Sequence, residues 1–178
     1  MKILIHGCAG RMGLTLVRLI DADPALDLHG GLEGPEHADI GADLGVLAGL
    51  PENGKPVRAD ALELISGADA VIDFSTPAAT LEMAGLCAQA RIVHIIGTTG
   101  FNAEGEAALA AAARHATLVK SGNMSLGVNL LGALVRQAAA ALGEDWDIEI
   151  LDMHHRHKVD TPSGTALLLG EEAAAGRD

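Results

Sequence analysis

Three glycines spaced three residues apart follow the first apolar run of the chain, and they constrain its fold more than any other feature. The run Lys2–His6 is apolar and β-branched, and the turn Gly7-Cys8-Ala9-Gly10-Arg11-Met12-Gly13 then opens a stretch of helical character. A strand that enters a glycine turn and continues as a helix presents backbone amides at a tight bend, where a pyrophosphate binds. The pattern therefore predicts an α/β fold with a dinucleotide site at its first turn.

An acidic residue stands where such a site needs one. Glu33 follows the second apolar run and lies 20 residues after Gly13, at the distance where a carboxylate meets the ribose hydroxyls. Gly34 comes next, so no cation is adjacent for a 2′-phosphate, which favours NADH. Arg11 could reach the same region, so use of NADPH stays open. The alternative is a turn that only packs closely and binds nothing.

Short apolar runs alternate with helical stretches along the chain, which predicts a Rossmann-like, doubly wound parallel sheet. The runs are continuous rather than alternating, as expected for strands covered on both faces. Residues 34–59 are polar and glycine-rich and are predicted to form a long loop. The predicted strands are residues 2–6, 26–32, 70–74, 92–96, 117–120 and 147–153. The predicted helices are residues 11–21, 61–66, 77–90, 103–115, 125–142 and 163–175.

Two further loops follow predicted strands and are candidate ligand loops. Gly97, Thr98 and Thr99 come after the fourth strand. Ser121, Gly122, Asn123 and Met124 come after the fifth. Either loop alone reads as an ordinary turn, but in an open α/β sheet ligands bind beyond the carboxyl ends of the strands. The shared edge therefore favours a cofactor-binding role for both.

The densest group of titratable residues is 152–158, which contains three of the eight histidines and Lys158. A basic cluster in a chain of net charge −12 indicates an anionic ligand. The next helix start supplies amides and the hydroxyls of Ser163 and Thr165, which suit a carboxylate. Histidine and lysine can also move protons near neutral pH.

Three other interpretations of this cluster stay open. Metal binding by the histidines is disfavoured because adjacent residues of an extended segment point to opposite faces, and no further ligand completes a tetrahedral site. A solvated basic loop without a role is the second. Nucleophilic catalysis by Ser163 is the third, but no G-x-S-x-G motif is present.

Charge and composition exclude several partners. The chain has 12 Lys and Arg residues against 24 Asp and Glu, which does not suit a nucleic-acid binder. No stretch approaches the roughly 20 apolar residues that span a bilayer. Cys8 and Cys87 lie far apart and form no CxxC pair, so we expect a cytoplasmic protein without a metal site.

The motifs together resemble one family. Residues 154–167, His-His-Arg-His-Lys-Val-Asp-Thr-Pro-Ser-Gly-Thr-Ala-Leu, closely resemble the signature of 4-hydroxy-tetrahydrodipicolinate reductase (dihydrodipicolinate reductase). The turn 7–13, residues 73–77, residues 97–101 and residues 123–129 are similar to that family in the same order. The resemblance covers essentially the whole chain. It implies NAD(P)H-dependent reduction of a cyclic dicarboxylate in the diaminopimelate route to lysine, by a homo-oligomer that is a tetramer in the family.

The resemblance also implies a role for each matching residue. His154 corresponds to the acid/base residue and Lys158 to the proton donor. His155, Gly164 and Thr165 correspond to substrate-binding residues. The cofactor-binding residues correspond to Gly7, Cys8, Ala9, Gly10, Arg11, Met12, Glu33, Gly97, Thr98, Thr99, Ser121, Gly122, Asn123 and Met124.

The sequence departs from the family at three places. Gly34 stands where some relatives carry arginine, and Met124 stands where others carry phenylalanine. Family members also continue well past Asp178, which implies a C-terminally truncated chain. We therefore expect a dinucleotide-binding domain at 1–122 and a partial substrate-binding and oligomerisation domain at 123–178.

Two other functions stay open. Because the C-terminal part is missing, the chain could be a non-catalytic dinucleotide-binding fragment. An oxidoreductase of aspartate-semialdehyde or homoserine type is ranked last, because Cys87 falls within a predicted helix.

Overall fold

The computed structural model describes residues 1–154, 156 and 161–178. His155, His157, Lys158, Val159 and Asp160 lie outside this description. Contacts divide the chain into two compact units, Met1–Lys120 and Ser121–Asp178, and each is described by itself.

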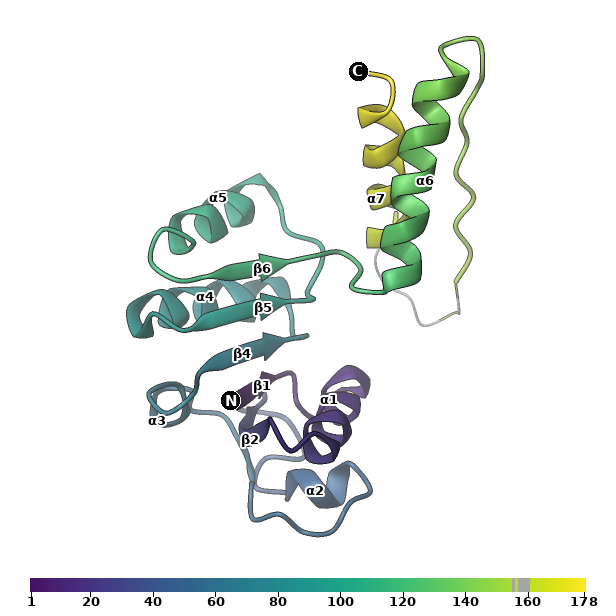
Figure 1. Cartoon of the computed structure of the whole chain (residues 1–178). Helices are drawn as coiled ribbons and strands as arrows, with labels where there is room; N and C mark the ends of the chain where they lie inside the picture. The colour runs from purple at the N-terminus through teal and green to yellow at the C-terminus, as the bar shows by residue number, and fades with distance from the viewer. Residues whose placement is uncertain (155, 157–160) are drawn as a thin grey trace. The chain divides into compact units, whose positions relative to one another are not determined.

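The first unit is a six-stranded parallel sheet with helices between its strands (Figure 1). Its strands are β1 (Lys2–His6), β2 (Asp27–Leu32), β3 (Val57–Arg58), β4 (Ala70–Asp73), β5 (Val93–Ile96) and β6 (Leu118–Lys120). Its helices are α1 (Arg11–Ala22), α2 (Leu44–Leu47), α3 (Leu62–Ile65), α4 (Pro77–Ala90) and α5 (Ala103–Ala112). The predicted doubly wound parallel sheet is confirmed.

The strand order is β3-β2-β1-β4-β5-β6. Strands β2 and β3 are added on one side of β1 and strands β4 to β6 on the other, so the strand order reverses between β1 and β4. His6 at the end of β1 is in register with Leu32 of β2 and with Asp73 of β4. All carboxyl ends lie along one edge, and in such sheets the crevice at the reversal point is where ligands bind.

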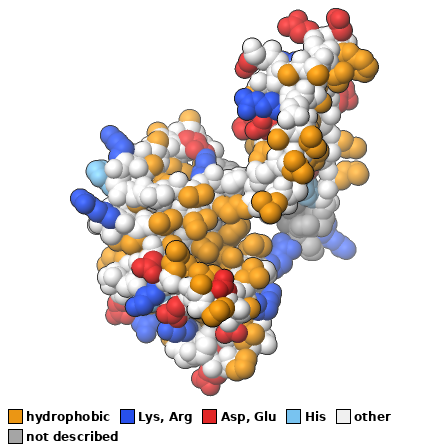
Figure 2. All heavy atoms as spheres, in the orientation of Figure 1, with side chains coloured by type: hydrophobic (Ala, Val, Ile, Leu, Met, Phe, Trp, Pro, Cys, Tyr) orange, Lys and Arg blue, Asp and Glu red, His pale blue; other side chains and the backbone are white. Residues whose placement is uncertain are grey.

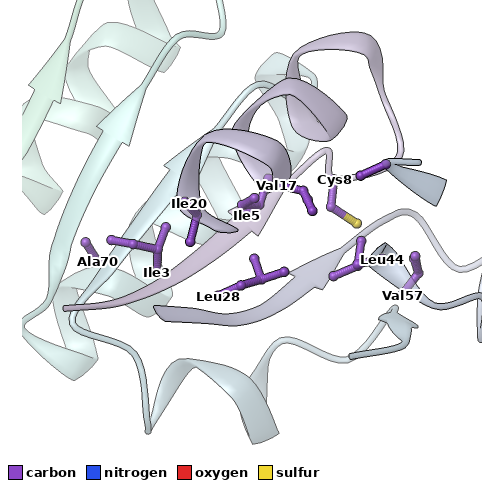
Figure 3. Close-up of a cluster of buried hydrophobic side chains, with 10 residues drawn as sticks. Ile3, Ile5, Cys8, Val17, Ile20, Leu28, Leu44, Val57 and Ala70 are labelled. Atoms are coloured by element: carbon purple, nitrogen blue, oxygen red, sulfur yellow. The ribbon is translucent and has the colours of Figure 1, made fainter. Parts of the chain in front are cut away.

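Alternate residues of the strands pack on opposite faces of the sheet. Ile3 and Ile5 of β1 pack with Val17 and Ile20 of α1 on one face (Figure 3). Leu4 packs on the other face in a cluster with residues of α3 and α4. A third cluster joins Ile96 of β5 to α4 and α5. Burial on both faces explains why the strands are continuously apolar.

The predicted loop at 34–59 is corrected by the structure, because it contains α2 and β3. The Asp43 carboxylate accepts hydrogen bonds from the backbone amides of Val46, Asn53 and Gly54, which closes this segment on itself. β3 is two residues long and pairs with Gly31 and Leu32. An element that short has no hydrophobic period from which to predict it.

The second unit pairs two helices, α6 (Leu126–Leu142) and α7 (Gly164–Ala175). The two helices approach closely at a glycine of α6: a Cβ on Gly132 would lie 3.1 Å from Leu168 of α7. Figure 2 shows hydrophobic side chains along the surface of this unit, and Leu126 and Leu130 of α6 are exposed.

The strand predicted at 147–153 does not form, which corrects the sixth predicted strand. Among the residues described in the second unit, none is in a strand, so this segment has no neighbour with which to form a ladder. Leu151 and Met153 are 84% and 81% exposed. The apolar run therefore misled the prediction, because a strand needs a hydrogen-bonding partner as well as apolar residues.

In the part of the chain that the structure describes, every helix is too short or too polar to cross a lipid bilayer.

Candidate cofactor and substrate sites

The first turn of the sheet is closed by glycines that leave no room for side chains. Gly7 has φ +79°, and a Cβ there would lie 2.6 Å from the carbonyl oxygen of Phe74. A Cβ on Gly13 would lie 2.3 Å from the carbonyl oxygen of Gly7 and 2.5 Å from that of Cys8. The backbone of α1 therefore approaches the turn as closely as a pyrophosphate cradle requires.

Helix α1 begins without a side-chain cap. Its N-cap residue is Gly10, which provides no side-chain hydrogen bond. The other helices of ten or more residues are capped by the side chains of Thr76, Asn102, Ser125 and Ser163. The first-turn amides of a helix have no partner within the helix, so those of α1 are free for a ligand oxygen. This start fits the phosphate groups of a dinucleotide.

Glu33 lies beside the turn. It follows β2, and its Oε1 accepts a hydrogen bond of 2.9 Å from the backbone amide of Ala9. Gly34 has open space around it, because a Cβ added there would meet no atom within 4 Å. The structure thus brings together the two predicted parts of the cofactor site that are 24 residues apart in sequence, Ala9 and Glu33.

A cavity of about 760 Å³ opens over this edge of the sheet. Its wall includes the turn, the segment from Leu32 to His37 and the start of α4. The ionisable side chains that line it are His6, Glu33, Glu36, His37 and Glu82. The lining residues include neither lysine nor arginine, so the described wall of the cavity is acidic.

The predicted cofactor residues Cys8, Arg11 and Met12 do not line this cavity. Cys8 is fully buried in the core against α1 (Figure 3), so only its backbone can meet a ligand. Burial, with the nearby Glu33 charge, raises the pKa of Cys8 to about 12. Arg11 and Met12 are exposed in the first turn of α1.

A buried polar network lies under the same edge and was missed by sequence reasoning. The Asp73 carboxylate is fully buried at the end of β4. Its Oδ2 lies 3.1 Å from Nδ1 of His6 and 3.1 Å from Nε2 of His94. Its Oδ1 accepts a hydrogen bond of 2.6 Å from Ser75 Oγ. The available signal was a polar residue in each of three otherwise apolar strands.

The surroundings of Asp73 keep it ionised. Burial by itself raises the pKa of a carboxyl, but the hydrogen bonds from His6, His94 and Ser75 outweigh it. The pKa of Asp73 is therefore held well below its usual range. The network is thus organised around a buried negative charge.

The predicted loop after β5 joins this network rather than the cavity wall. Thr98 is buried, and its Oγ1 accepts a hydrogen bond of 3.0 Å from Thr80 and lies 3.4 Å from Asp73 Oδ1. A Cβ on Gly97 would collide with the Phe74 ring, at 2.1 Å. Thr99 is half-buried, and none of residues 97–99 lines the cavity.

In the second unit the structure joins two predicted loops. Nδ2 of Asn123 donates a hydrogen bond of 2.9 Å to Oγ1 of Thr165, and Gly122 lies against Gly164. Ser121 Oγ donates to the carbonyl of Asn123, at 2.7 Å. Predicted cofactor residues and predicted substrate residues therefore share one cluster at the start of α7. Met124, in the same loop, is 42% exposed.

His154 is paired with a neighbouring carboxylate. Its Nε2 lies 2.6 Å from Oδ1 of Asp152. Hydrogen bonding to Ser163 and to His154 lowers the pKa of Asp152. Both residues line a cavity of about 770 Å³ whose wall includes Thr161, Ala166 and Leu167. The predicted residues His155 and Lys158 lie outside the described residues.

Comparisons with known proteins match both parts of the chain to the same family. The family described as dihydrodipicolinate reductase, N-terminus, matches residues 1–124, and dihydrodipicolinate reductase, C-terminus, matches residues 127–178. The chain is 67% identical to the 4-hydroxy-tetrahydrodipicolinate reductase of Parvibaculum lavamentivorans, covering 99% of this chain and 66% of that protein. It is 60% identical to that of Rhizobium rhizogenes, covering 99% and 65%.

A solved structure is also similar. The dipicolinate-bound dihydrodipicolinate reductase from Paenisporosarcina sp. TG-14 matches with a TM-score of 0.71 at 26% identity, covering 99% of this chain and 66% of that one. The chain thus spans about two thirds of the length of the relatives that it matches.

Proposed function

This chain belongs to the dihydrodipicolinate reductase family, and on that premise we propose that it reduces 4-hydroxy-tetrahydrodipicolinate to tetrahydrodipicolinate in lysine and diaminopimelate biosynthesis. The observation that carries the proposal is the glycine turn at the uncapped start of α1, with Glu33 bonded to Ala9 beside it. Such a turn binds a dinucleotide, and the family reduces with a nicotinamide dinucleotide.

Different residues of the first unit bind different parts of the cofactor in this proposal. The backbone of the glycine turn and the first-turn amides of α1 hold the pyrophosphate. Glu33 exchanges its hydrogen bond to Ala9 for the ribose hydroxyls. When bound, the reduced nicotinamide supplies the hydride.

We propose that NADH is preferred over NADPH. A 2′-phosphate adds negative charge beside Glu33, in a cavity whose wall also carries Glu36 and Glu82. Arg58 of β3, in register with Leu32 of β2, is already paired with Glu63 at 2.8 Å. Gly34 provides no side chain to offset the repulsion. Arg11 is exposed on α1 and leaves some use of NADPH open.

The second unit holds the substrate and the proton donors in this proposal. His154 acts as the acid/base residue, and the Asp152 carboxylate orients its ring through Nε2. Lys158 donates the proton that accompanies hydride transfer, a role implied by the match of the 154–167 signature to the family. His155, Gly164 and Thr165 hold the carboxylates, with the α7 amides and the Asn123–Thr165 hydrogen bond supporting them.

The setting of this activity is also a proposal. The relatives are biosynthetic enzymes, and the two cysteines are both buried and unpaired, which suits the cytoplasm. We propose a homo-oligomer, a tetramer as in the family.

The test separates cofactor binding from chemistry. NADH absorbance is followed with enzymatically made substrate, and NADH affinity is measured separately. His154→Ala and Lys158→Ala should each lower kcat by about 10²–10⁴, the usual contribution of a general acid or base, and leave the Kd for NADH within about twofold. Glu33→Ala should weaken NADH binding instead.

The outcomes are distinct. Loss of NADH binding in the His154 and Lys158 variants would mean that the cluster serves the cofactor. NADH binding with no turnover by the unaltered protein would support the alternative function, a dinucleotide-binding module without catalysis.

A further inference from the structure

His6 connects the buried Asp73 network to the cofactor cavity. Its side chain is 12% exposed and lines the cavity, while its Nδ1 faces Asp73 Oδ2 at 3.1 Å. Among the described residues, Nδ1 of His94 is the one fully buried side-chain polar atom without a partner. The described hydrogen bonds of His6 both use Nδ1, to Asp73 Oδ2 at 3.1 Å and to Ser75 Oγ at 3.4 Å, and His6 lines the cavity, which leaves its Nε2 for a ligand.

The side chains around His6 are mostly acidic, so the cavity wall carries few groups that can balance the charge of an anionic ligand. Glu33 follows β2, Glu36 lies in the next segment and Glu82 is on α4, and all three line the same cavity. Asp73 on β4 adds a buried negative charge behind the ring. His6 and His37 are the ionisable nitrogen bases among the lining residues. Among the side chains that line this cavity, imidazoles are therefore the groups that can carry a positive charge toward a pyrophosphate.

His6 is better placed to take a proton than the second histidine of the network. His94 is fully buried, and its Nδ1 has no acceptor among the described residues. A proton there would create a buried N–H without a partner, which costs free energy. A proton on Nε2 of His6 would face the cavity, where an anion can accept its hydrogen bond.

We propose that His6, held by Asp73 through Nδ1, contacts the cofactor's pyrophosphate through a protonated Nε2, so that dinucleotide binding takes up a proton. An anion near an imidazole favours its charged form, and by linkage the protonated protein binds the anion more tightly. Asp73 stays ionised at neutral pH because its pKa is low, so it neutralises the ring from behind. The inference rests on the proposed function, since it requires a dinucleotide in this cavity.

Binding measurements with cofactor fragments test the proposal. The Kd values for ADP-ribose, which contains the pyrophosphate, and for adenosine, which lacks it, are measured by calorimetry at about pH 6 and about pH 8, on either side of the ordinary histidine range. Repeating the titration in buffers with different ionisation heats counts the protons taken up. We expect ADP-ribose to bind at least roughly fivefold more tightly at the lower pH, with proton uptake, and adenosine to show neither effect.

Substitutions identify the residue that takes the proton. His6→Gln should remove both the pH dependence and the proton uptake. His6→Asn is the second variant if His6→Gln does not fold, because its amide can still donate to Asp73 from the Nδ1 position. His37→Gln and His115→Gln, the latter an exposed histidine beyond α5, should keep the pH dependence.

Three results would overturn the inference: equal ADP-ribose affinity at both pH values, a pH dependence that survives in the folded His6 variant, or one that disappears in His37→Gln. Each leaves the proposed function intact as long as ADP-ribose binds. A protein that binds neither ADP-ribose nor NADH at any pH would instead contradict the proposed function itself.

Discussion

Gly13 of α1 rests directly on the turn that precedes the helix: a Cβ at this position would lie 2.3 Å from the carbonyl oxygen of Gly7. The contact is between backbone atoms, so no side-chain rotation can relieve it. The first turn of α1 is thereby held against Gly7 and Cys8, in the turn that we propose as the phosphate cradle.

Gly13→Ala should therefore damage both stability and binding. The added methyl must push α1 away from the turn, which we expect to lower the free energy of unfolding by about 2–3 kcal/mol. NADH affinity should fall at least about tenfold, because the amides move from the pyrophosphate. Urea denaturation and fluorescence titration measure the two effects. Gly34→Ala is the matched control: its Cβ meets no atom within 4 Å, so its stability should change by less than about 0.5 kcal/mol.

Gly34→Arg should shift the cofactor preference toward NADPH. The open space at Gly34 accommodates the side chain, and a guanidinium beside Glu33 can pair with a 2′-phosphate. We expect the ratio of Kd values, NADPH over NADH, to fall about tenfold, equivalent to about 1.4 kcal/mol. Gly85→Arg, at an exposed position of α4 with no atom within 4 Å, adds the same charge elsewhere and should leave the ratio unchanged. An equal shift in both variants would contradict our account of cofactor choice.

Asp73→Asn should destabilise the first unit by about 3 kcal/mol at neutral pH, because it removes a buried charge that two histidines and Ser75 face. The pKa of Asp73 is lower in the folded protein than its ordinary value of about 3.9 in an unfolded chain. Its contribution is therefore complete above that value and is lost as the pH falls below about 4. Chemical denaturation across this range should show the two stability curves converging in acid.

The exposed residue Asp21 provides a comparison for that experiment. Asp21→Asn should change stability by less than about 0.5 kcal/mol at any pH. Parallel curves for the unaltered protein and Asp73→Asn down to strong acid would show that Asp73 is not the anion of the network.

Both thiols should be unreactive in the folded protein. Cys8 and Cys87 are fully buried, and burial raises the pKa of each to about 12, so the reactive thiolate is scarce at about pH 8. A coloured disulfide reagent should label neither cysteine rapidly in buffer and both in urea. Rapid labelling of one thiol without denaturant would show that the core beside it opens readily.

The sheet was predictable because its strands are bounded by strong local signals. Pro77 after Thr76 predicts the start of α4, and the glycine turn marks the end of β1. β3 and α2 could not be predicted, because their arrangement depends on Asp43 binding amides up to 11 residues away. At 147–153 a strand was predicted that the structure does not contain, because the hydrophobicity of the run indicates burial but not a partner strand.

Part of the candidate site could likewise be predicted from the sequence and part could not. The proximity of Glu33 to the glycine turn was predictable, because the spacing of a dinucleotide motif implies it, and the Ala9–Glu33 hydrogen bond shows it. The roles of His6 and His94 were not, because each is a single polar residue in an apolar strand and only the parallel register brings both to Asp73. The roles predicted for the cofactor-binding, substrate-binding and catalytic residues all stay predictions.

The uncapped start of α1 has a consequence for how long the protein survives in a cell. A helix whose first amides lack hydrogen-bond partners is less stable without ligand. Free dinucleotide at 100 times its Kd would raise the free energy of unfolding by about 2.7 kcal/mol. A protease acting on the opened chain would then degrade it fastest when the cofactor pool is low. The same missing side chain that makes room for the phosphate thus ties the abundance of the protein to the supply of its cofactor.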